Sequence, residues 1–404
     1  MLFDSIIIYL VSYFSLFVGI FFLYTFFENR AKMKGPKIKK FPKISILIPA
    51  YNAEKFIKKT IECALNCDYP EKEIIVIDDG STDRTYQIVK KFKNKGVKIF
   101  KKENGGKASA LNFGIDKCNG KLIMTLDADS FLEKDTIRKM VAYFKDRNVM
   151  SVVPTLKVYN PKTIIERMQV IEYTLTSFIR KIFTFMHGLN VNPCAPIYRA
   201  EFLKKNKFDE DNLTEDLEMG LRVQSQHYDI QHAIDANVYT IVPNNLKSLM
   251  KQRVRWNYGT IWNLKNKYGF MFSLKYGDLG LFILPTTLIF FGLAVFLLIY
   301  YVGRLLWNVI YNIYFLSLIG FDMKYALFGG GTTQIMNYLI DMKMFLFLSL
   351  FIIGGTICLL AKRTLNEKRF RFSYFIYISL YSIFLGIFPL IAILYIIFRK
   401  KPKW

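Results

Sequence analysis

The stretch that decides the fold reads ISILIPAYNAEKFIKKTIECALNCDYPEKEIIVIDDGSTD from Ile44 to Asp83. It opens with a continuous apolar run over Ile44–Ile48 that is rich in β-branched residues, which predicts a buried strand. Apolar residues at helical spacing follow over Ala53–Asn66, and a second apolar run covers Glu73–Ile77. A strand, a helix and a strand in this order predict a βαβ unit with two parallel strands.

The same alternation continues along the chain. We expect a helix from about Arg84, a strand over Val97–Phe100, a helix over Lys107–Cys118 and a strand over Lys121–Leu126. This order predicts an α/β domain with a mostly parallel sheet that is covered on both faces. Because ligands bind beyond the carboxyl ends of the strands in such sheets, the residues that follow each strand are the candidates for a site.

An Asp-Ala-Asp motif at Asp127–Asp129 follows the fourth of these strands. In an extended chain Asp127 and Asp129 would point to the same face, about 6 to 7 Å apart along the strand. Two carboxylates there are suited to hold Mg²⁺ or Mn²⁺ against the oxygens of a diphosphate. A solvated turn is the open alternative, because Asp-x-Asp also occurs by chance.

Tyr51 and Asp79 follow the first and second strands, and we interpret them as contacts to a nucleotide base or ribose. The Gly105-Gly106-Lys107 segment is typical of a phosphate loop that opens a helix, with Lys107 as the cation for the diphosphate. The Asp-Gly-Ser-Thr-Asp sequence around Asp79 is equally typical of a turn and helix cap, and both interpretations are compatible.

A Thr-Glu-Asp motif at Thr214–Asp216 precedes apolar residues at helical spacing. It therefore lies at a helix N-terminus, where acidic side chains also act as caps. If the motif is catalytic, Asp216 is the better general base, because inverting displacement at an anomeric carbon needs a carboxylate opposite the leaving group. We count Glu215 and Asp127 with it as candidate catalytic acids.

On a helix, Gln252, Arg255, Trp256 and Gly259 fall on one face, while an apolar stripe lies on another. The stripe consists of Leu246, Met250, Val254, Tyr258 and Ile261. This pattern predicts an interfacial helix on a membrane leaflet. Arg255 is suited to pair with a diphosphate and Trp256 to stack on an acceptor sugar, and a simple amphipathic anchor is the open alternative.

The composition indicates that part of the chain lies in lipid, since 52% of its 404 residues are hydrophobic. Four segments without Asp, Glu, Lys or Arg are long enough, or nearly so, to span a bilayer. They are Ile6–Phe27, Leu279–Gly303, Met344–Ala361 and Phe372–Phe398. We predict four transmembrane helices, with a fifth at Leu305–Phe321 as the alternative.

The net charge of +24, from 56 basic and 32 acidic residues, is concentrated beside these apolar segments. The stretch Asn29–Lys43 carries seven Lys or Arg and no acid, which predicts that the polar region from Asn29 to about Tyr276 is cytoplasmic. Attraction to anionic lipid headgroups explains such clusters, so we expect a membrane partner and no nucleic acid. The prediction is a multi-pass protein of the cell membrane with a cytoplasmic catalytic domain.

Taken in order, these motifs resemble the membrane-integrated family 2 glycosyltransferases, in particular the cellulose, chitin, hyaluronan and poly-N-acetylglucosamine synthases. The resemblance implies a GT-A catalytic domain with a nucleotide-diphospho-sugar transferase sheet, and inverting transfer from a UDP-sugar. It makes Tyr51 and Asp79 uridine contacts, Lys107 and Asp127 diphosphate contacts, and Asp129 the metal ligand. It also makes Asp216 the general base. Gln252, Arg255 and Trp256 would close the site and bind the acceptor.

Two further segments bear on the resemblance. Gln169, Glu172 and Tyr173 match a Gln-x-x-Glu-Tyr element of these synthases, on a helix near the path of the acceptor. The Asn-Pro-Cys-Ala sequence over residues 192–195 departs from the family, which places a glycine there, near an acceptor-binding loop.

The expected organisation is a transmembrane helix over residues 1–28, a GT-A domain over 29–245, interfacial helices over 246–276 and a transmembrane region over 277–404. The expected reaction adds sugars to the non-reducing end of a growing polysaccharide, with Mg²⁺ or Mn²⁺, and is coupled to export. The alternative is a single transfer to a membrane lipid, such as a polyprenyl phosphate or a ceramide-like acceptor. Because four spans are few for an export channel, a homo-dimer or a small accessory subunit is an additional expectation.

Overall fold

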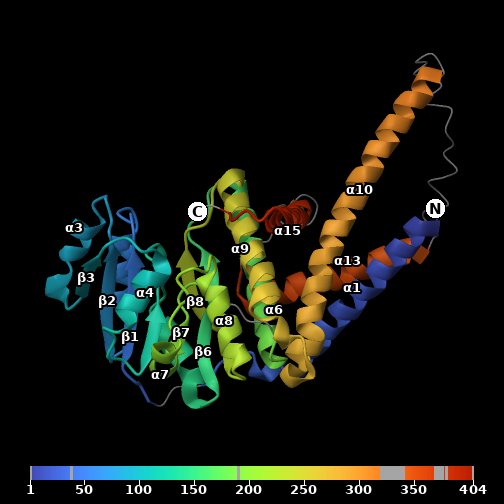
Figure 1. Cartoon of the computed structure of the whole chain (residues 1–404). Coiled ribbons are helices and arrows are strands. Elements are labelled where there is room, and N and C mark those ends of the chain that lie inside the picture. Colours follow the sequence, from blue (N-terminus) through green and yellow to red (C-terminus); the bar gives the residue numbers. More distant parts are fainter. Residues whose placement is uncertain are drawn as a thin grey trace.

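The computed structural model describes residues 2–36, 40–188, 192–318, 342–367, 377 and 381–402. The strands are β1 Ile44–Ala50, β2 Lys72–Asp79, β3 Lys98–Lys102, β4 Leu122–Thr125, β5 Ser130–Leu132, β6 Val149–Val158, β7 Ile197–Arg199 and β8 Asp229–Thr240. The helices of the α/β domain are α2 Ile57–Leu65, α3 Thr85–Lys90, α4 Lys107–Ile115, α5 Thr136–Val141, α7 Ala200–Lys205 and α8 Glu215–Ser225. The helices beside it are α1 Leu2–Glu28, α6 Ile164–Phe185, α9 Leu246–Asn266, α10 Leu284–Leu318, α13 Met342–Thr364 and α15 Ser382–Ile397. Figure 1 shows α6 and α9 between the sheet and the long helices α1, α10 and α13.

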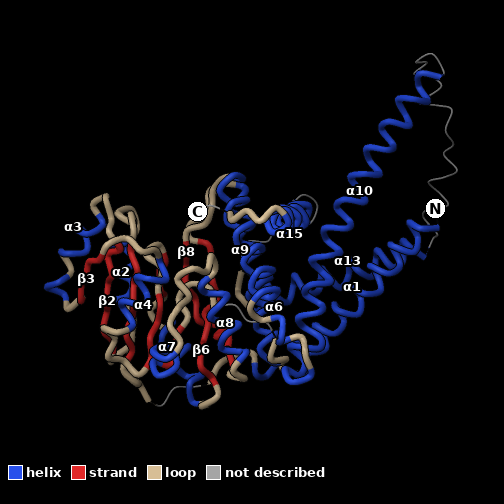
Figure 2. The backbone as a smooth tube through the Cα atoms, viewed as in Figure 1, coloured by secondary structure: helices blue, strands red, loops and turns tan. Residues whose placement is uncertain are grey.

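The strands form one eight-stranded sheet in the order β3-β2-β1-β4-β7-β6-β8-β5, which is drawn in red in Figure 2. Strands β3, β2, β1 and β4 are parallel, as the βαβ pattern predicted. The rest of the sheet is mixed, because β7 runs antiparallel to both β4 and β6, and β5 runs antiparallel to β8. The expectation of a mostly parallel sheet was therefore too simple, since β5 and β7 have only three residues each and leave no periodic signal.

Apolar residues of the strands form a core on each face of the sheet. Ile44, Ile46 and Ile48 of β1 are fully buried in one core, and Leu47 is fully buried in the other. This alternation follows from the two-residue period of a strand, and a strand buried on both faces is apolar throughout. Helix α4 approaches β1 closely at Gly114, where a Cβ atom would meet Leu47 Cδ1 at 2.2 Å.

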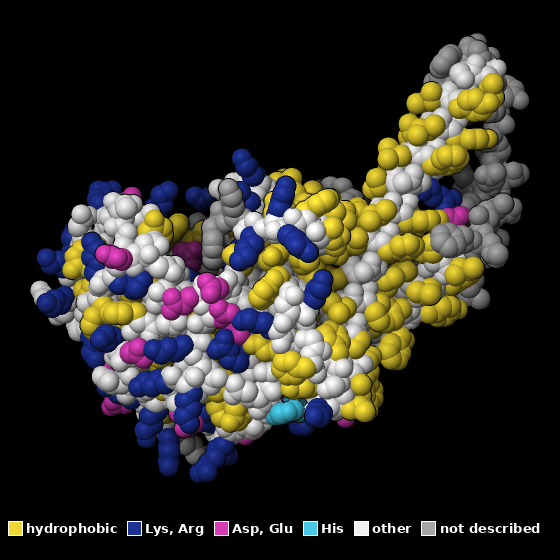
Figure 3. Space-filling model, in the orientation of Figure 1, with side chains coloured by type: hydrophobic (Ala, Val, Ile, Leu, Met, Phe, Trp, Pro, Cys, Tyr) yellow, Lys and Arg dark blue, Asp and Glu magenta, His cyan; other side chains and the backbone are white. Residues whose placement is uncertain are grey.

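Two helices are long and apolar enough to cross a membrane, by length and composition, among the residues that the structure describes. They cover Asp4–Glu28 and Leu279–Tyr314. Figure 3 shows hydrophobic side chains along the outer surface of these helices, whereas Lys and Arg are spread over the α/β domain. The alternative fifth span was predicted over Leu305–Phe321. As far as Leu318, these residues belong to α10 and do not form a helix of their own.

The other two predicted spans are described in part. Met344–Ala361 lies within α13, and the second half of Phe372–Phe398 forms α15. Residues 372–376 and 378–380 lie outside the described residues. The number of spans, four or five, therefore stays a prediction.

Much of the apolar stripe of α9 packs against α15, while Leu246 at its start is exposed. Val254 and Tyr258 pack with Ala392, and Leu249 packs with Phe388. The amphipathic pattern correctly predicted a helix here, and its position on a membrane leaflet stays a prediction. It did not identify the partner, because an apolar stripe has the same sequence whether lipid or another helix covers it.

Candidate active site

The loops that follow β1 and β2 are joined by hydrogen bonds. Asn52 has a left-handed backbone with φ of 47°, and its Oδ1 accepts hydrogen bonds from the backbone N–H of Thr82 at 2.9 Å and of Asp83 at 3.4 Å. The backbone N–H of Asn52 donates to Ser81 Oγ at 3.1 Å. These contacts fix Tyr51 at the carboxyl edge of the sheet, where its side chain is about half exposed.

Asp79 holds the loop that contains the two glycines. Its Oδ1 accepts from Lys102 Nζ at 2.8 Å and from the backbone N–H of Gly105 at 3.1 Å, and its Oδ2 accepts from the N–H of Gly106 at 2.8 Å. The backbone N–H groups of the two glycines thus bind the carboxylate of Asp79, whereas in a phosphate-binding loop they would face a phosphate. A direct contact between Asp79 and uridine stays a prediction.

Lys107 brings two of the predicted motifs together. Its Nζ lies 2.8 Å from Asp127 Oδ1 and 3.0 Å from Glu215 Oε1. Although burial lowers it, the pKa of Lys107 is raised well above its usual value by the carboxylates of Asp127, Glu215 and Asp216. The predicted diphosphate cation and both acidic motifs therefore share one site.

Asp127, Ala128 and Asp129 form a turn between β4 and β5, not the extended segment that we expected. The backbone N–H of Ser130 donates to the carbonyl of Asp127 at 3.1 Å, which closes the turn. Burial and the neighbouring charge of Asp127 raise the pKa of Asp129 to about 6.

This pair of carboxylates fits a divalent cation. Oxygen ligands suit Mg²⁺ and Mn²⁺, and a cation would relieve the repulsion that raises the pKa of Asp129. Among the described residues, no group of three or more His, Cys, Asp or Glu gathers as a metal site. The remaining ligands of a metal held by Asp127 and Asp129 would be water and oxygens of the substrate, which is the usual arrangement for Mg²⁺ with phosphates.

Thr214, Glu215 and Asp216 lie at the start of α8, as predicted. The side chain of Thr214 makes no capping hydrogen bond, and Asp216 Oδ1 accepts from the adjacent backbone N–H of Leu217 at 2.8 Å. Burial and the charge of Glu215 raise the pKa of Asp216 to about 6, against the opposing effect of Lys107 and Arg255. A carboxylate with this pKa is suited to accept a proton near neutral pH.

Helix α9 places Arg255 beside these acids. Its Nη1 donates to the carbonyl of Leu213 at 3.4 Å, and its charge acts on Asp216, Glu215 and Asp127. Gln252 and Trp256 lie on the same helix and both contact Arg253. The structure thus joins the third motif to the first two.

Arg253, which the sequence analysis passed over, is the buried centre of its own network. Its Nη2 and Nε donate to the two carboxylate oxygens of Glu172 at 2.7 and 2.9 Å, and its guanidinium lies 4.3 Å from the ring centroid of Trp256. Tyr381 Oη also donates to Glu172, at 2.7 Å. The matched Gln-x-x-Glu-Tyr element was the signal, because a buried acid on α6 needs a cationic partner.

The helices α8 and α9 meet at Thr214 and Gly259. A Cβ atom on Gly259 would lie 2.2 Å from Thr214 Oγ1. One turn further along α9, Asn263 Nδ2 donates to Thr214 Oγ1 at 3.3 Å, while Asn212 Nδ2 donates to Asn263 Oδ1 at 2.8 Å. These contacts fix the residue that precedes Glu215 and Asp216.

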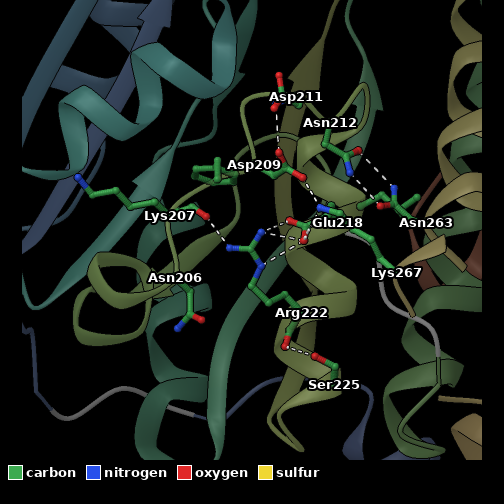
Figure 4. Close-up of polar contacts among 12 residues, drawn as sticks. Asn206, Lys207, Asp209, Asp211, Asn212, Glu218, Arg222, Ser225, Asn263 and Lys267 are labelled. Atoms are coloured by element: carbon green, nitrogen blue, oxygen red, sulfur yellow. Dashed lines mark hydrogen bonds and ion pairs between the residues drawn. The ribbon is translucent and has the colours of Figure 1, made fainter. Parts of the chain in front are cut away.

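The segment that leads into α8 is held by charged groups, as Figure 4 shows. Arg222 Nη2 lies 2.6 Å from Glu218 Oε2, and Arg222 Nη1 donates to the carbonyl of Lys207 at 2.5 Å. Lys267 forms an ion pair with Asp209. The segment from 207 to 214 is therefore attached to both α8 and α9, which orients the acids of the Thr-Glu-Asp motif.

Four of the predicted residues line a small hollow, in which the space between atoms, open solvent included, is about 240 Å³. Its wall contains Lys107, Asp127, Glu215 and Asp216 of the predicted site. It also contains residues that the sequence analysis did not select, namely Leu111, Thr125, Asn192, Cys194, Pro196, Tyr198 and Phe208. A small hollow with acids, a lysine and an apolar wall is suited to part of a sugar nucleotide.

Comparison with known protein families identifies one domain of this chain. The family described as Glycosyl transferase family 2 matches residues 45–206. The chain contains a family 2 glycosyltransferase domain. This region includes the motifs at Tyr51, Asp79, Lys107 and Asp127, whereas Asp216 and α9 follow it.

Two curated relatives are similar to a longer part of the chain. A poly-beta-1,6-N-acetyl-D-glucosamine synthase from Staphylococcus epidermidis is 33% identical over 222 residues, which are 54% of this chain and 54% of the relative. The synthase of the same description from Staphylococcus aureus strain COL is 31% identical over 266 residues, 64% of each chain. The match thus covers less than two thirds of the length of these relatives.

A solved structure shows the same fold. A mannosyltransferase from Pyrobaculum calidifontis, in complex with GDP-Man and Mn²⁺, superposes with a TM-score of 0.52 at 19% identity. The superposition covers 65% of this chain and 75% of the mannosyltransferase. The mixed sheet of the glycosyltransferase domain is therefore of the GT-A type.

Proposed function

We propose that the protein is a membrane-bound inverting glycosyltransferase that transfers a sugar from a UDP-sugar to the non-reducing end of a growing polysaccharide. The observation that carries the proposal is the position of Lys107 between Asp127 and Glu215, with Asp216 in the same hollow. It joins a diphosphate cation, a metal-binding pair and a base in one site. The two curated relatives, which are polysaccharide synthases by description, support the polymer as product.

The donor occupies the edge of the sheet. Tyr51 lies against the uracil base and the loop held by Asp79 forms the wall beside it. Lys107 leaves its ion pairs with the acids and binds the diphosphate, because a phosphate oxygen is an equally good anionic partner. Asp127 and Asp129 would hold Mg²⁺ or Mn²⁺, which when bound neutralises the charge that develops on the leaving diphosphate.

The acceptor approaches from α9. Trp256 stacks on the terminal sugar, and Gln252 and Arg255 close the site over the donor. Asp216 accepts the proton of the attacking hydroxyl as the oxygen bonds to the anomeric carbon, and UDP leaves from the opposite side, so the anomeric configuration inverts. The raised pKa of Asp216 matches this role, since it makes the carboxylate a stronger base than an exposed aspartate.

Membrane helices beside the site would receive the product. We propose that α1, α10, α13 and the segment ending in α15 are four spans, with the glycosyltransferase domain in the cytoplasm, and that a second copy or a small accessory subunit completes an export channel. Helix α9 supports this arrangement because it contacts the acids through α8 on one side and α15 on the other.

The test is release of UDP by the purified full-length protein in detergent. UDP-N-acetylglucosamine, UDP-glucose and UDP-glucuronate are offered separately, with Mg²⁺ or Mn²⁺, and labelled products are sized. We expect a polymer from one donor and its loss in Asp216→Asn. A product with one sugar per lipid would favour the single-transfer alternative, and turnover unchanged by Asp216→Asn would refute the assignment of the base.

A further inference from the structure

Tyr198 of β7 carries a buried hydroxyl that no described residue satisfies. Its side chain is fully buried, its ring packs edge-on against Phe208, and its Oη has no hydrogen-bond partner among the described residues. Burial raises its pKa well above the usual value, so the hydroxyl remains a donor at neutral pH. Leaving such a group unpaired costs about 1 to 3 kcal/mol, which a purely structural residue such as Phe would avoid.

Asn192 supplies a second donor of the same kind. It is fully buried, and its Oδ1 accepts from Ser151 Oγ at 2.9 Å, so one end of the amide is bound by the protein. Its Nδ2 has no hydrogen-bond partner within the described chain. Between Asn192 and Tyr198, Ala195 is fully buried and has a left-handed φ of 64°, a conformation that persists only where the surroundings impose it.

Both residues line the hollow that holds Lys107 and Asp127. The remaining wall includes the apolar side chains of Leu111, Pro196 and Phe208. Two fixed donors beside an apolar surface complement a group that has an accepting oxygen next to a methyl group. An N-acetyl substituent has this chemistry, whereas a sugar hydroxyl presents no methyl group.

The position of the hollow assigns the group to the donor sugar. Its described lining residues come from α4, from β4 and the turn after it, from β7 and the segment before it, and from α8 and the segment before it. None comes from α6 or α9. Lys107 and Asp127, the diphosphate side of the proposed site, form part of the lining, whereas Trp256 on the acceptor side does not. A substituent on the sugar nearest the diphosphate reaches this hollow first.

We propose that Tyr198 and Asn192 form a specificity subsite that donates hydrogen bonds to the acetamido carbonyl of a UDP-2-acetamido sugar. The inference rests on the proposed function for the identity of the donor. It adds two specificity-determining residues to the site. Because a site built around buried donors rejects a substrate that leaves them unpaired, the same residues discriminate against UDP-glucose.

The experiment measures binding and turnover separately in the full-length protein. Calorimetry gives the Kd of UDP, UDP-glucose and UDP-N-acetylglucosamine for the wild type and for Tyr198→Phe, which removes only the hydroxyl. Asn192→Asp, which keeps the oxygen held by Ser151 and removes the Nδ2 donor, is the second variant. Tyr69→Phe is the matched control, because it removes another buried tyrosine hydroxyl, which donates to the Pro42 carbonyl at 2.6 Å.

We expect the wild type to bind UDP-N-acetylglucosamine more tightly than UDP-glucose, and Tyr198→Phe to reduce this preference about tenfold. UDP affinity is expected to stay unchanged, and so is the preference in Tyr69→Phe. An unchanged preference in both Tyr198→Phe and Asn192→Asp, or an equal loss for both sugars, would overturn the subsite. If Tyr198→Phe loses the binding preference but the wild type transfers no sugar, the subsite is supported and the proposed transfer is refuted. If the wild type makes a polymer and Tyr198→Phe keeps the preference, the proposed transfer is supported and the subsite is refuted.

Discussion

The contact between Gly259 of α9 and Thr214 before α8 makes a sharp prediction for Gly259→Ala. A Cβ atom at this position would lie 2.2 Å from Thr214 Oγ1, 2.4 Å from Cγ2 and 2.8 Å from Cβ. Ordinary contact begins at 3.4 Å, so the closest pair is about 1.2 Å too near. Thr214 is short, and Asn212 and Asn263 hold its hydroxyl, so the overlap moves either α9 or the start of α8.

The size of the effect follows from two opposing terms. Replacing a helical glycine by alanine favours the helix by about 0.8 to 1.0 kcal/mol, whereas overpacking a tight contact costs about 1 to 3 kcal/mol. We therefore expect a net loss of up to about 2 kcal/mol in the free energy of unfolding. A displacement of about 1 Å at Asp216, which lies two residues after Thr214, lowers kcat about 10- to 100-fold.

The assay compares kcat, the KM for the UDP-sugar and the thermal midpoint of the purified protein. The KM is expected to change little, because Tyr51 and Lys107 lie on other elements. Gly292→Ala is the matched control, since a Cβ on this glycine of α10 has no atom within 4 Å. Equal kcat in Gly259→Ala and Gly292→Ala, or a more stable Gly259→Ala protein, would refute the reasoning.

Three further predictions follow from the site. Glu172→Gln should lower the free energy of unfolding by about 3 kcal/mol, because it leaves the buried guanidinium of Arg253 without its anionic partner; a thermal midpoint equal to that of the wild type would contradict this. The kcat/KM should rise with pH as Asp216 loses its proton, with a midpoint near the raised pKa of about 6; a profile that is flat between about pH 5 and about pH 7 would exclude this carboxylate as the base. Asp129→Asn should lower Mn²⁺-dependent turnover about 10- to 100-fold. Its affinity for UDP, measured without metal, should equal that of the wild type. Turnover equal to that of the wild type would remove Asp129 from the metal site.

The parallel half of the sheet was predictable because burial on both faces leaves a strong signal. Strand β1 is buried at every position, so its sequence is a continuous apolar run. The predicted strand at Glu73–Ile77 is β2, extended by a residue or two at each end. The short strands β5 and β7 left no signal, because three residues are too few to show a period and their pairing is set by distant partners.

Four residues that line the hollow were selected from the sequence, whereas their contacts were not predictable. Asp127 follows a strand and Glu215 and Asp216 begin a helix, both of which were visible in the sequence, and the order of the motifs indicated one site. The ion pair of Lys107 with Glu215 joins residues far apart in the sequence, so it depends on the packing of α4 against α8 and has no local pattern. The orphaned donors of Asn192 and Tyr198 were equally invisible, because an isolated Asn or Tyr is common in any core.

One feature of α9 was within reach of the sequence. Arg255, Gly259 and Asn263 are spaced at i, i+4 and i+8, so they form a single ridge. The structure places all three against the segment that carries Thr214. The sequence analysis already placed Gly259 on this face, and extending the motif by one more helical turn would have added Asn263, which fixes the contact.

The opposite side of the same helix packs on α15 through Val254 and Tyr258. A rigid helix transmits a shift on one side to the other, because its backbone hydrogen bonds hold both faces in register. A movement of α15 would therefore displace Gly259 relative to Thr214, where the contact has almost no free space. The tight packing at this glycine links the orientation of Asp216 to the helices that we propose to lie in the membrane.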